Sequence, residues 1–255
     1  MSSIRNPTFE VIRKRSSVRK FSTAEIPEPL LLELLELANQ APSGFNLQPW
    51  HFVLVRNPEL KQIMRHLAME QIQVAEAPAV VVFVADPDAW KNSYDQVLEL
   101  GLRSRQMDAR RVERYRKNVH LLFKNGPFGT FGLLKRIGVP IRRLFKPTPA
   151  VITSRLEAAQ YVRSQTMLSA ATFMIAAKAA GLETSPIEGF DEDRLKRLLA
   201  VPRSMTIPVI VAIGQPLDAS SLTPTVRLPL EQKVSIDLFP NRLKATARAT
   251  GKAPS

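Results

Sequence analysis

Residues 42–52 read PSGFNLQPWHF, a polar, turn-forming stretch that runs directly into the apolar residues HFVLV. A turn needs only two or three residues such as Pro, Ser, Gly and Asn, and this stretch has more. Ser43, Asn46 and Gln48 supply hydrogen-bond donors and acceptors, and Gly44 lets a backbone come close to a ligand. The stretch therefore has two interpretations: a loop that ends a helix beside a buried Trp, or one wall of a binding site.

The segments on either side of this stretch predict an α+β fold. Strands are predicted at 51–55, 78–86 and 205–216, and the second is apolar almost throughout, as a strand covered on both faces would be. Helices are predicted at 7–15, 27–41, 58–77, 154–183 and 190–201. We expect a small mixed, mainly antiparallel sheet flanked by helices, in one domain over residues 1–255, because no repeat or linker divides the chain.

The composition excludes several kinds of site. The 255 residues contain no cysteine, which rules out disulfides, thiolate metal ligands and a cysteine nucleophile. The three histidines, His51, His66 and His120, lack the spacing of a metal site. The N-terminus lacks the apolar core of a signal peptide, and no apolar run reaches the roughly 20 residues that span a bilayer. We therefore expect a cytoplasmic protein without a metal.

The net charge of +13 is concentrated in one segment. Residues 101–150 hold 13 Lys or Arg and two acids, which makes +11, so the rest of the chain carries only +2. The first part of this basic insertion, 102–123, has the pattern of a basic helix, and the second part mixes Gly, Pro, Phe, Leu and Arg. An insertion of this length is usually functional or mobile.

Four interpretations of the basic insertion stay open. It is a solvated helical excursion, because exposed charged faces are common, or a lid over a neighbouring pocket. It is a contact with an anionic membrane, because FGTFGLLKRIGVPIRRLF interleaves apolar residues with Lys and Arg. Nucleic-acid binding is the least favoured, because the charge is suitable but the segment has no recognised motif and few aromatic residues for stacking.

Two further stretches, RSSVRKF at 15–21 and SPIEGF at 185–190, have the composition of binding segments. Alternate residues of an extended segment face the same way, so Arg15, Ser17 and Arg19 would present two guanidinium groups and a hydroxyl on one side. Such a set suits a phosphate, although a solvated basic cluster fits the same residues. SPIEGF is predicted to be a tight Pro-to-Gly turn, either a plain connection or a nest of backbone amides.

Together these stretches resemble the nitroreductase-like family of FMN-dependent oxidoreductases. The resemblance rests on RSSVRKF, APSGFNLQPWHF, QIQVAEAPAVVVFVAD, GLETSPIEGF, IPVIVAIGQP and TVRLPLEQKV, in the order in which the family has them. It covers residues 10–95 and 155–235, and the basic insertion lies outside it. The resemblance implies an intertwined homodimer with two FMN sites at the interface, each built by both subunits.

The resemblance also implies roles for individual residues. The cofactor-binding residues that it indicates are Arg15, Ser16, Ser17, Arg19, Pro42, Ser43, Gly44, Asn46, Gln73, Pro186, Ile187, Glu188, Gly189 and Arg227. Arg15, Ser17 and Arg227 would hold the FMN phosphate. Arg19 would lie near the ribityl chain and the N1/O2 edge of the flavin, and Gln73 near its pyrimidine edge.

The other implied contacts involve backbone and the second subunit. Residues 42–46 would come from the other subunit, and 186–189 would lie against the ring with a backbone N–H near flavin N5. Glu188 would position the ring through its backbone, and no residue is assigned an acid–base role. Many relatives have a Lys or Arg where Thr225 stands, and some have a Lys about where Gln73 stands. The loss of one cation near N1/O2, where Gln73 stands, is expected to weaken the stabilisation of the reduced, anionic flavin, and Arg19 is the residue expected to compensate.

The implied function is an FMN-dependent NAD(P)H oxidoreductase with ping-pong hydride transfer. The hydride would pass from NADPH or NADH to flavin N5 and then to a nitroaromatic, a quinone or a similar small electrophile. The alternative is a non-enzymatic or specialised flavoprotein, a flavin sensor or carrier or a peripheral-membrane electron-transfer protein, docked through the basic insertion. A basic binding module without flavin is a third hypothesis. The polar tail at about 243–255 is predicted to be flexible.

Overall fold

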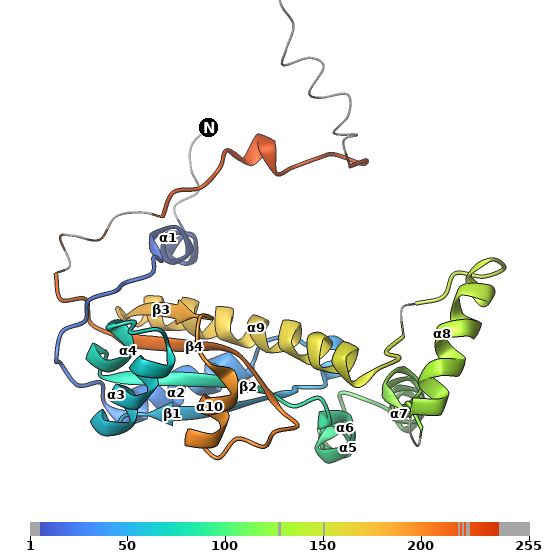
Figure 1. Ribbon diagram of the computed structural model, residues 1–255. Coiled ribbons are helices and arrows are strands. Elements are labelled where there is room, and N and C mark those ends of the chain that lie inside the picture. Colours follow the sequence, from blue (N-terminus) through green and yellow to red (C-terminus); the bar gives the residue numbers. More distant parts are fainter. Residues whose placement is uncertain are drawn as a thin grey trace, which may run out of the picture.

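Four antiparallel strands form one sheet in the order β1-β2-β4-β3 (Figure 1). The computed structural model describes residues 6–126, 129–149, 151–218, 220, 222 and 225–239. The strands are β1 (Trp50–Val55), β2 (Ala79–Ala85), β3 (Glu183–Ile187) and β4 (Thr206–Gly214). Every residue of β2 and all of β4 except Thr206 are buried, because helices cover both faces of these two central strands. The predicted α+β fold with a small, mainly antiparallel sheet is confirmed.

Two layers of helices enclose the sheet. One face packs against α3 (Pro58–Leu67), α4 (Gln73–Glu76) and α10 (Glu192–Leu198), and the other packs against α2 (Glu28–Asn39) and α9 (Arg155–Ala179). The alternation of side chains along β2 decides which layer each residue meets, so Val82 packs with the first layer and Phe83 with the second. Phe83 contacts Phe173 of α9 with the ring centroids 5.7 Å apart.

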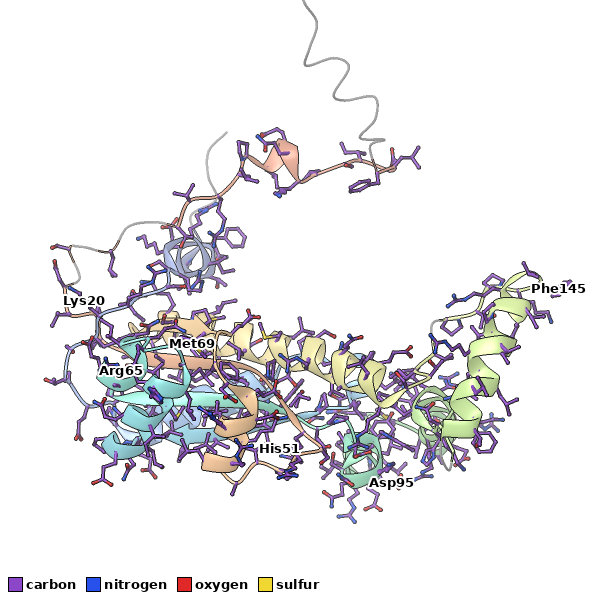
Figure 2. All side chains as sticks on the ribbon, in the orientation of Figure 1. Lys20, His51, Arg65, Met69, Asp95 and Phe145 are labelled. Atoms are coloured by element: carbon purple, nitrogen blue, oxygen red, sulfur yellow. The ribbon has the colours of Figure 1, made fainter. Side chains whose placement is uncertain are left out.

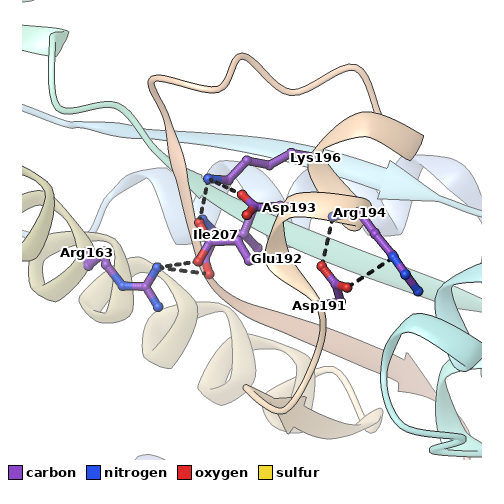
Figure 3. A network of polar contacts seen from close by, with 7 residues as sticks. All are labelled: Arg163, Asp191, Glu192, Asp193, Arg194, Lys196 and Ile207. Atoms are coloured by element: carbon purple, nitrogen blue, oxygen red, sulfur yellow. Dashed lines mark hydrogen bonds and ion pairs between the residues drawn. The ribbon is translucent and has the colours of Figure 1, made fainter.

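A half-buried carboxylate joins α10 to α9 and β4 (Figure 3). Glu192 accepts hydrogen bonds from the Ile207 N–H at 2.9 Å and from Arg163 Nη1 at 3.1 Å, and it pairs with Lys196 Nζ at 2.9 Å. Burial alone would raise the pKa of Glu192, but the hydrogen bonds from Ile207 and Lys196 and the nearby positive charges lower it below its ordinary value. The ionised side chain therefore fixes α10 against the end of the sheet.

The N-terminal segment extends the sheet beyond β3. After α1 (Pro7–Lys14) the chain runs alongside β3, where Ser17 forms a parallel bridge with Thr184. Farther on, the Ser22 N–H donates to Gln215 O at 2.9 Å, just beyond the end of β4. The RSSVRKF motif and the SPIEGF motif therefore lie side by side.

The region between β2 and α9 is helical. Its helices are α5 (Ala89–Asn92), α6 (Tyr94–Arg103), α7 (Ala109–Phe123) and α8 (Thr130–Arg143). Leu98 of α6 and Val119 of α7 belong to a buried cluster that also includes Ala158 at the start of α9. In Figure 1, α7 and α8 form the end of the molecule away from the sheet, and α8 projects farther than any other helix there.

Several predicted boundaries are wrong. The helix predicted over 58–77 is two helices, because the chain takes positive φ at Met69 (55°) and Glu70 (58°), which a helix cannot continue. Glu70 stabilises this break by bonding back to Arg65 at 3.1 Å and to His66 at 2.7 Å. The helix predicted over 154–183 ends at Ala179, because Gly181 takes φ 79°.

The structure corrects two further predictions. SPIEGF is not a tight turn over its whole length, because Pro186 lies inside β3 and pairs with Val211. Proline is tolerated there because β3 is the edge strand of the four-stranded sheet. The basic helix predicted over 102–123 is broken at 104–108, and α7 starts afresh where Asp108 accepts a hydrogen bond from the Arg111 N–H at 2.7 Å.

The C-terminal part of the described chain is an exposed arm. Residues 225–239 are exposed throughout, including the short 3-10 helix η4 (Leu230–Gln232) and the apolar side chains of Val226, Ile236 and Phe239. The predicted flexible tail at about 243–255 lies outside the described residues. Within the described ranges, no helix is both long enough and apolar enough to cross a membrane.

Candidate functional site

The RSSVRKF motif is an extended segment with two faces. Ser16 and Val18 are buried, while Ser17 and Arg19 are exposed, so alternate residues face the same way as predicted. Arg15 stands at the junction with α1, where its N–H donates to Val11 O at 3.0 Å and closes the helix. This geometry holds Arg15 between a rigid helix and the edge of the sheet.

The guanidinium of Arg15 carries an unused donor. Its Nη1 atom is buried and, among the described residues, has no hydrogen-bond partner. A buried donor without an acceptor is costly, especially on a charged group. A phosphate oxygen would satisfy it, because arginine presents paired donors that match phosphate geometry. The Ser17 hydroxyl, which lies two residues on in the extended segment and so on the same side as Arg15, can donate to the same group.

A second group of predicted residues follows β3. Pro186 and Ile187 end the strand, and Glu188 and Gly189 after it are exposed. Gln73 is buried and is joined to this group by a relay of two hydrogen bonds. Gln73 Nε2 donates to Gln71 Oε1 at 3.0 Å, and Gln71 Nε2 donates to Gly189 O at 3.1 Å. The relay fixes the bend after β3 and leaves the exposed side of Glu188 and Gly189 open to a ligand.

The stretch from Pro42 to Gln48 is held elsewhere, by the first half of α9. The Gly44 N–H donates to Gln165 Oε1 at 2.7 Å. A Cβ atom at Gly44 would lie 2.0 Å from the Tyr161 hydroxyl, so only glycine allows this approach. Ser43 Oγ accepts from the Gln48 N–H at 2.9 Å, and Pro42 and Asn46 are exposed.

This loop is strained and braced. Phe45, Asn46 and Gln48 take positive φ of 58°, 56° and 48°, which is unfavourable for residues with a Cβ. The Tyr94 hydroxyl donates to Phe45 O at 3.2 Å, and Trp50 Nε1 donates to Asn39 Oδ1 at 2.8 Å. Burial raises the pKa of Tyr94, which therefore keeps the proton that it donates.

The two groups of residues lie at opposite corners of the sheet. Thr184, beside Ser17, pairs with Ile213, which pairs with Ala79 at the start of β2, whereas Trp50 pairs with Ala85 at its end. Six residues along a strand correspond to about 20 Å, and the three strand spacings from β1 to β3 add about 14 Å across the sheet. One chain therefore does not bring residues 42–46 to Arg15.

Arg227 is not brought to the other predicted residues either. It lies in the exposed arm, where its Nη1 donates to Val226 O at 3.0 Å. Four residues that hold these segments were not predicted from the sequence: Gln71, Thr184, Tyr161 and Gln165. Tyr161 and Gln165 are four residues apart in a predicted helix, which places them on one face, but this spacing does not indicate which loop they contact.

A cavity of about 540 Å³ borders the same N-terminal segment. Arg19 and Lys20 line it together with Leu217 and Asp218. Ser16 and Ser17 also line this cavity, whereas Arg15 is not among its described lining residues. Among the described residues no group of three or more His, Asp or Glu is arranged to hold a metal ion.

The sequence profile described as "Nitroreductase family" matches residues 12–215, which include the extended segment, both central strands and the bend after β3. The chain belongs to the nitroreductase family. It is therefore an oxidoreductase, and the predicted resemblance is confirmed. This family match spans the basic insertion and most of the two regions that carried the resemblance, but it ends at residue 215, before TVRLPLEQKV at 225–234.

Individual relatives agree with this assignment. A protein from Thermus thermophilus named "NADH dehydrogenase" is 31% identical over 221 residues, which is 87% of this chain and 91% of that protein. A nitroreductase-like protein from Streptococcus mutans superposes with a TM-score of 0.70 at 24% identity, covering 89% of this chain and 97% of that one. A nitroreductase from Exiguobacterium sibiricum, solved in complex with FMN, has a TM-score of 0.67 at 22% identity, covering 92% and 99%.

Proposed function

We infer that this oxidoreductase uses FMN and a reduced nicotinamide, NADPH or NADH. The observation that carries this inference is the buried Arg15 Nη1, which has no hydrogen-bond partner among the described residues. The FMN complex of the relative from Exiguobacterium sibiricum supports the same cofactor. A dianionic phosphate is the natural acceptor for such a donor set.

Each group of predicted residues would contact a different part of the cofactor. Arg15, Ser16 and Ser17 would hold the phosphate, and Arg227 would join them from the C-terminal arm. Arg19 would contact the ribityl chain, and Gln73, set by the Gln71 relay, would contact the pyrimidine edge. The residues that would lie against the ring are Pro186, Ile187, Glu188 and Gly189, of which the last two are exposed.

A second copy of the chain would supply the other wall. Pro42, Ser43, Gly44 and Asn46 lie at the opposite corner of the sheet from Arg15, so they would reach a site on the partner of a homodimer. The exposed arm at 225–239 also favours a partner, because it leaves Val226, Ile236 and Phe239 uncovered in the single chain. The site is then complete only at an interface.

FMN held by these residues would supply the redox chemistry, which is hydride transfer at N5 from the nicotinamide to an acceptor that enters the same pocket. The acceptor would be a nitroaromatic, a quinone or a similar small electrophile. The chain's own contribution is to bind, to orient and to hold charge near the ring. Arg19 is the predicted cation for this purpose, and Glu188 acts through its backbone.

The test begins with the visible spectrum of the purified protein, followed by anaerobic titration with NADPH and with NADH. A band near about 450 nm that bleaches on addition of either nicotinamide is the expected result. Turnover with a nitroaromatic or a quinone then identifies the acceptor class. A colourless protein that does not bind added FMN would contradict the proposal.

A further inference from the structure

Helix α8 is attached to the molecule by its polar side. Lys135 Nζ donates to three backbone carbonyls, those of Lys124 at 2.7 Å, Leu122 at 3.1 Å and Ile152 at 3.3 Å. Gly132 packs so closely that a Cβ atom there would lie 2.2 Å from Thr153 O. A helix on a protein surface normally buries its apolar side, whereas the side of α8 that is not exposed consists of Gly132, Lys135 and Val139 alone.

The apolar side of α8 faces solvent. Leu133, Ile137, Ile141 and Leu144 follow one another at spacings of four, four and three residues, so they lie along one side of the helix. The turn after α8 continues this helical path, because the Phe145 N–H donates to Arg142 O at 3.1 Å. We define the α8 apolar face as Leu133, Leu134, Ile137, Ile141, Leu144 and Phe145.

Every member of the α8 apolar face is exposed, from 55% for Ile141 to 80% for Leu144 and Phe145. Figure 2 shows Phe145 at the free end of α8, pointing away from the molecule. A groove of about 470 Å³ between α7 and α8 adds Leu121 and Phe131 to the uncovered apolar surface. An uncovered patch of this extent marks a contact surface.

Positive charge borders this face on both sides. At 100° per residue, Arg142 lies next to one edge of the apolar arc and Arg136 next to the other, with Arg143 and Lys146 between them on the far side. Residues 124–149 contain six Lys or Arg and no Asp or Glu. The surface therefore combines a long apolar stripe with uncompensated cations.

We propose that the α8 apolar face binds the surface of an anionic lipid bilayer, with α8 lying in the interface and its cations on the headgroups. A bilayer meets both requirements at once, because acyl chains cover the stripe and anionic headgroups pair with the flanking arginines. A second copy of the chain would have to place acids opposite these cations, and outside residues 101–150 the chain has a net charge of +2.

The position of α8 suits such a contact. It forms the end of the molecule away from the sheet, so a flat surface can reach it without meeting the layers around β2 and β4 (Figure 1). The helix spans 14 residues, which is too short to cross a bilayer but sufficient to lie on one. The contact does not depend on FMN, so its failure and the failure of the proposed cofactor are separate results.

The experiment is co-flotation of the full chain with vesicles of phosphatidylcholine alone or mixed with phosphatidylglycerol, at low and high salt. We expect binding only to the anionic vesicles and a loss of binding at high salt. The double variant Arg136→Gln, Arg142→Gln, which removes the two cations that flank the apolar face, should weaken binding about 25-fold, at about five-fold for each arginine. The matched control Arg197→Gln, Arg203→Gln removes two exposed cations elsewhere and should change binding less than about two-fold.

A spectroscopic readout tests the apolar face separately. Trp introduced by Ile141→Trp should shift its emission to the blue with anionic vesicles, whereas Trp introduced by Ile63→Trp on α3 should not. Absence of salt-sensitive flotation would overturn the proposal. Emission from the Trp at position 141 that is already shifted to the blue without vesicles would overturn it too, because the face would then be covered in the free protein. A Leu144→Ser, Phe145→Ser variant that stays folded and changes the molar mass in solution would assign the face to a second copy instead.

Discussion

The replacement Arg15→Gln separates the cofactor role of Arg15 from a structural role. The variant removes a guanidinium whose Nη1 is buried without a partner among the described residues, so the free protein loses no hydrogen bond at that atom. We expect its unfolding midpoint without FMN to stay the same or rise, because a buried unpaired donor is unfavourable. The FMN affinity should fall, since a hydrogen bond to a charged group contributes about 1.5–3 kcal/mol, or about 10- to 150-fold in Kd.

The two effects predict a specific thermal result. At an FMN concentration of about 100 times the wild-type Kd, the wild type gains about 2.7 kcal/mol of stability, and a variant with a 100-fold higher Kd gains only about 0.4 kcal/mol. Calorimetric unfolding with and without FMN measures this difference, and quenching of flavin fluorescence gives Kd directly. Arg13→Gln is the control, because Arg13 is exposed on α1 and pairs with Glu10 at 3.2 Å. An Arg15→Gln protein that binds FMN within about two-fold of the wild type, or that unfolds earlier without FMN, would refute the assignment.

Three further replacements test the scaffold. Gly44→Ala should lower the free energy of unfolding by about 1–3 kcal/mol. Adding Tyr161→Phe should restore most of this loss, because the new Cβ clashes with the Tyr161 hydroxyl. Thermal unfolding of the single and double variants measures both changes. Glu192→Gln should lower the free energy of unfolding by about 1 kcal/mol at neutral pH. Because the folded pKa of Glu192 is lowered, the wild type loses this advantage as the pH falls below the ordinary value of 4.5. The thermal unfolding midpoints of wild type and variant should therefore converge in acid. Lys135→Met should speed amide hydrogen exchange across α8 while leaving β2 protected, because Lys135 holds α8 to three carbonyls of α7 and its surroundings.

The central part of the fold could be predicted because its chemistry is local. The run at 78–86 has no polar alternation and is rich in Val, which favours a strand covered on both faces. Asn57 before Pro58 marks the start of α3, and the structure shows Asn57 Oδ1 accepting from the Leu60 N–H at 2.8 Å. These signals depend only on neighbours in sequence.

The elements that were missed depend on neighbours in space. Pro186 argued for a turn, but at the edge of the sheet it lies in β3 because one side of an edge strand needs no ladder bonds. No helix was predicted over 130–143, where Gly and Pro are mixed with apolar residues, yet α8 forms there, with Lys135 bonded to carbonyls near α7 and Gly132 packed against Thr153. Neither contact has a signature in the local sequence.

In the candidate site, too, the local conformation could be predicted from the sequence and the tertiary contacts could not. RSSVRKF was expected to be extended, and its alternating burial follows from that conformation alone. Its placement beside Thr184 and the relay from Gln73 through Gln71 to Gly189 are tertiary contacts that no spacing rule contains. The residues that would touch the cofactor stay predictions, while the scaffold that positions them is visible in the contacts.

The strain at residues 45–48 bears on how a two-chain site could work. Three residues with positive φ persist only when the surroundings hold them, and here the braces all come from the same chain: Gln165, Tyr94 and the Trp50–Asn39 pair. Pro42 and Asn46 are left exposed by this bracing. Contacts within one chain are therefore sufficient to brace the loop, and in the proposed dimer a second subunit would meet a preformed wall and not a segment that must first be ordered. Such preorganisation lowers the entropy lost on binding, which favours a cofactor site completed by docking two finished halves.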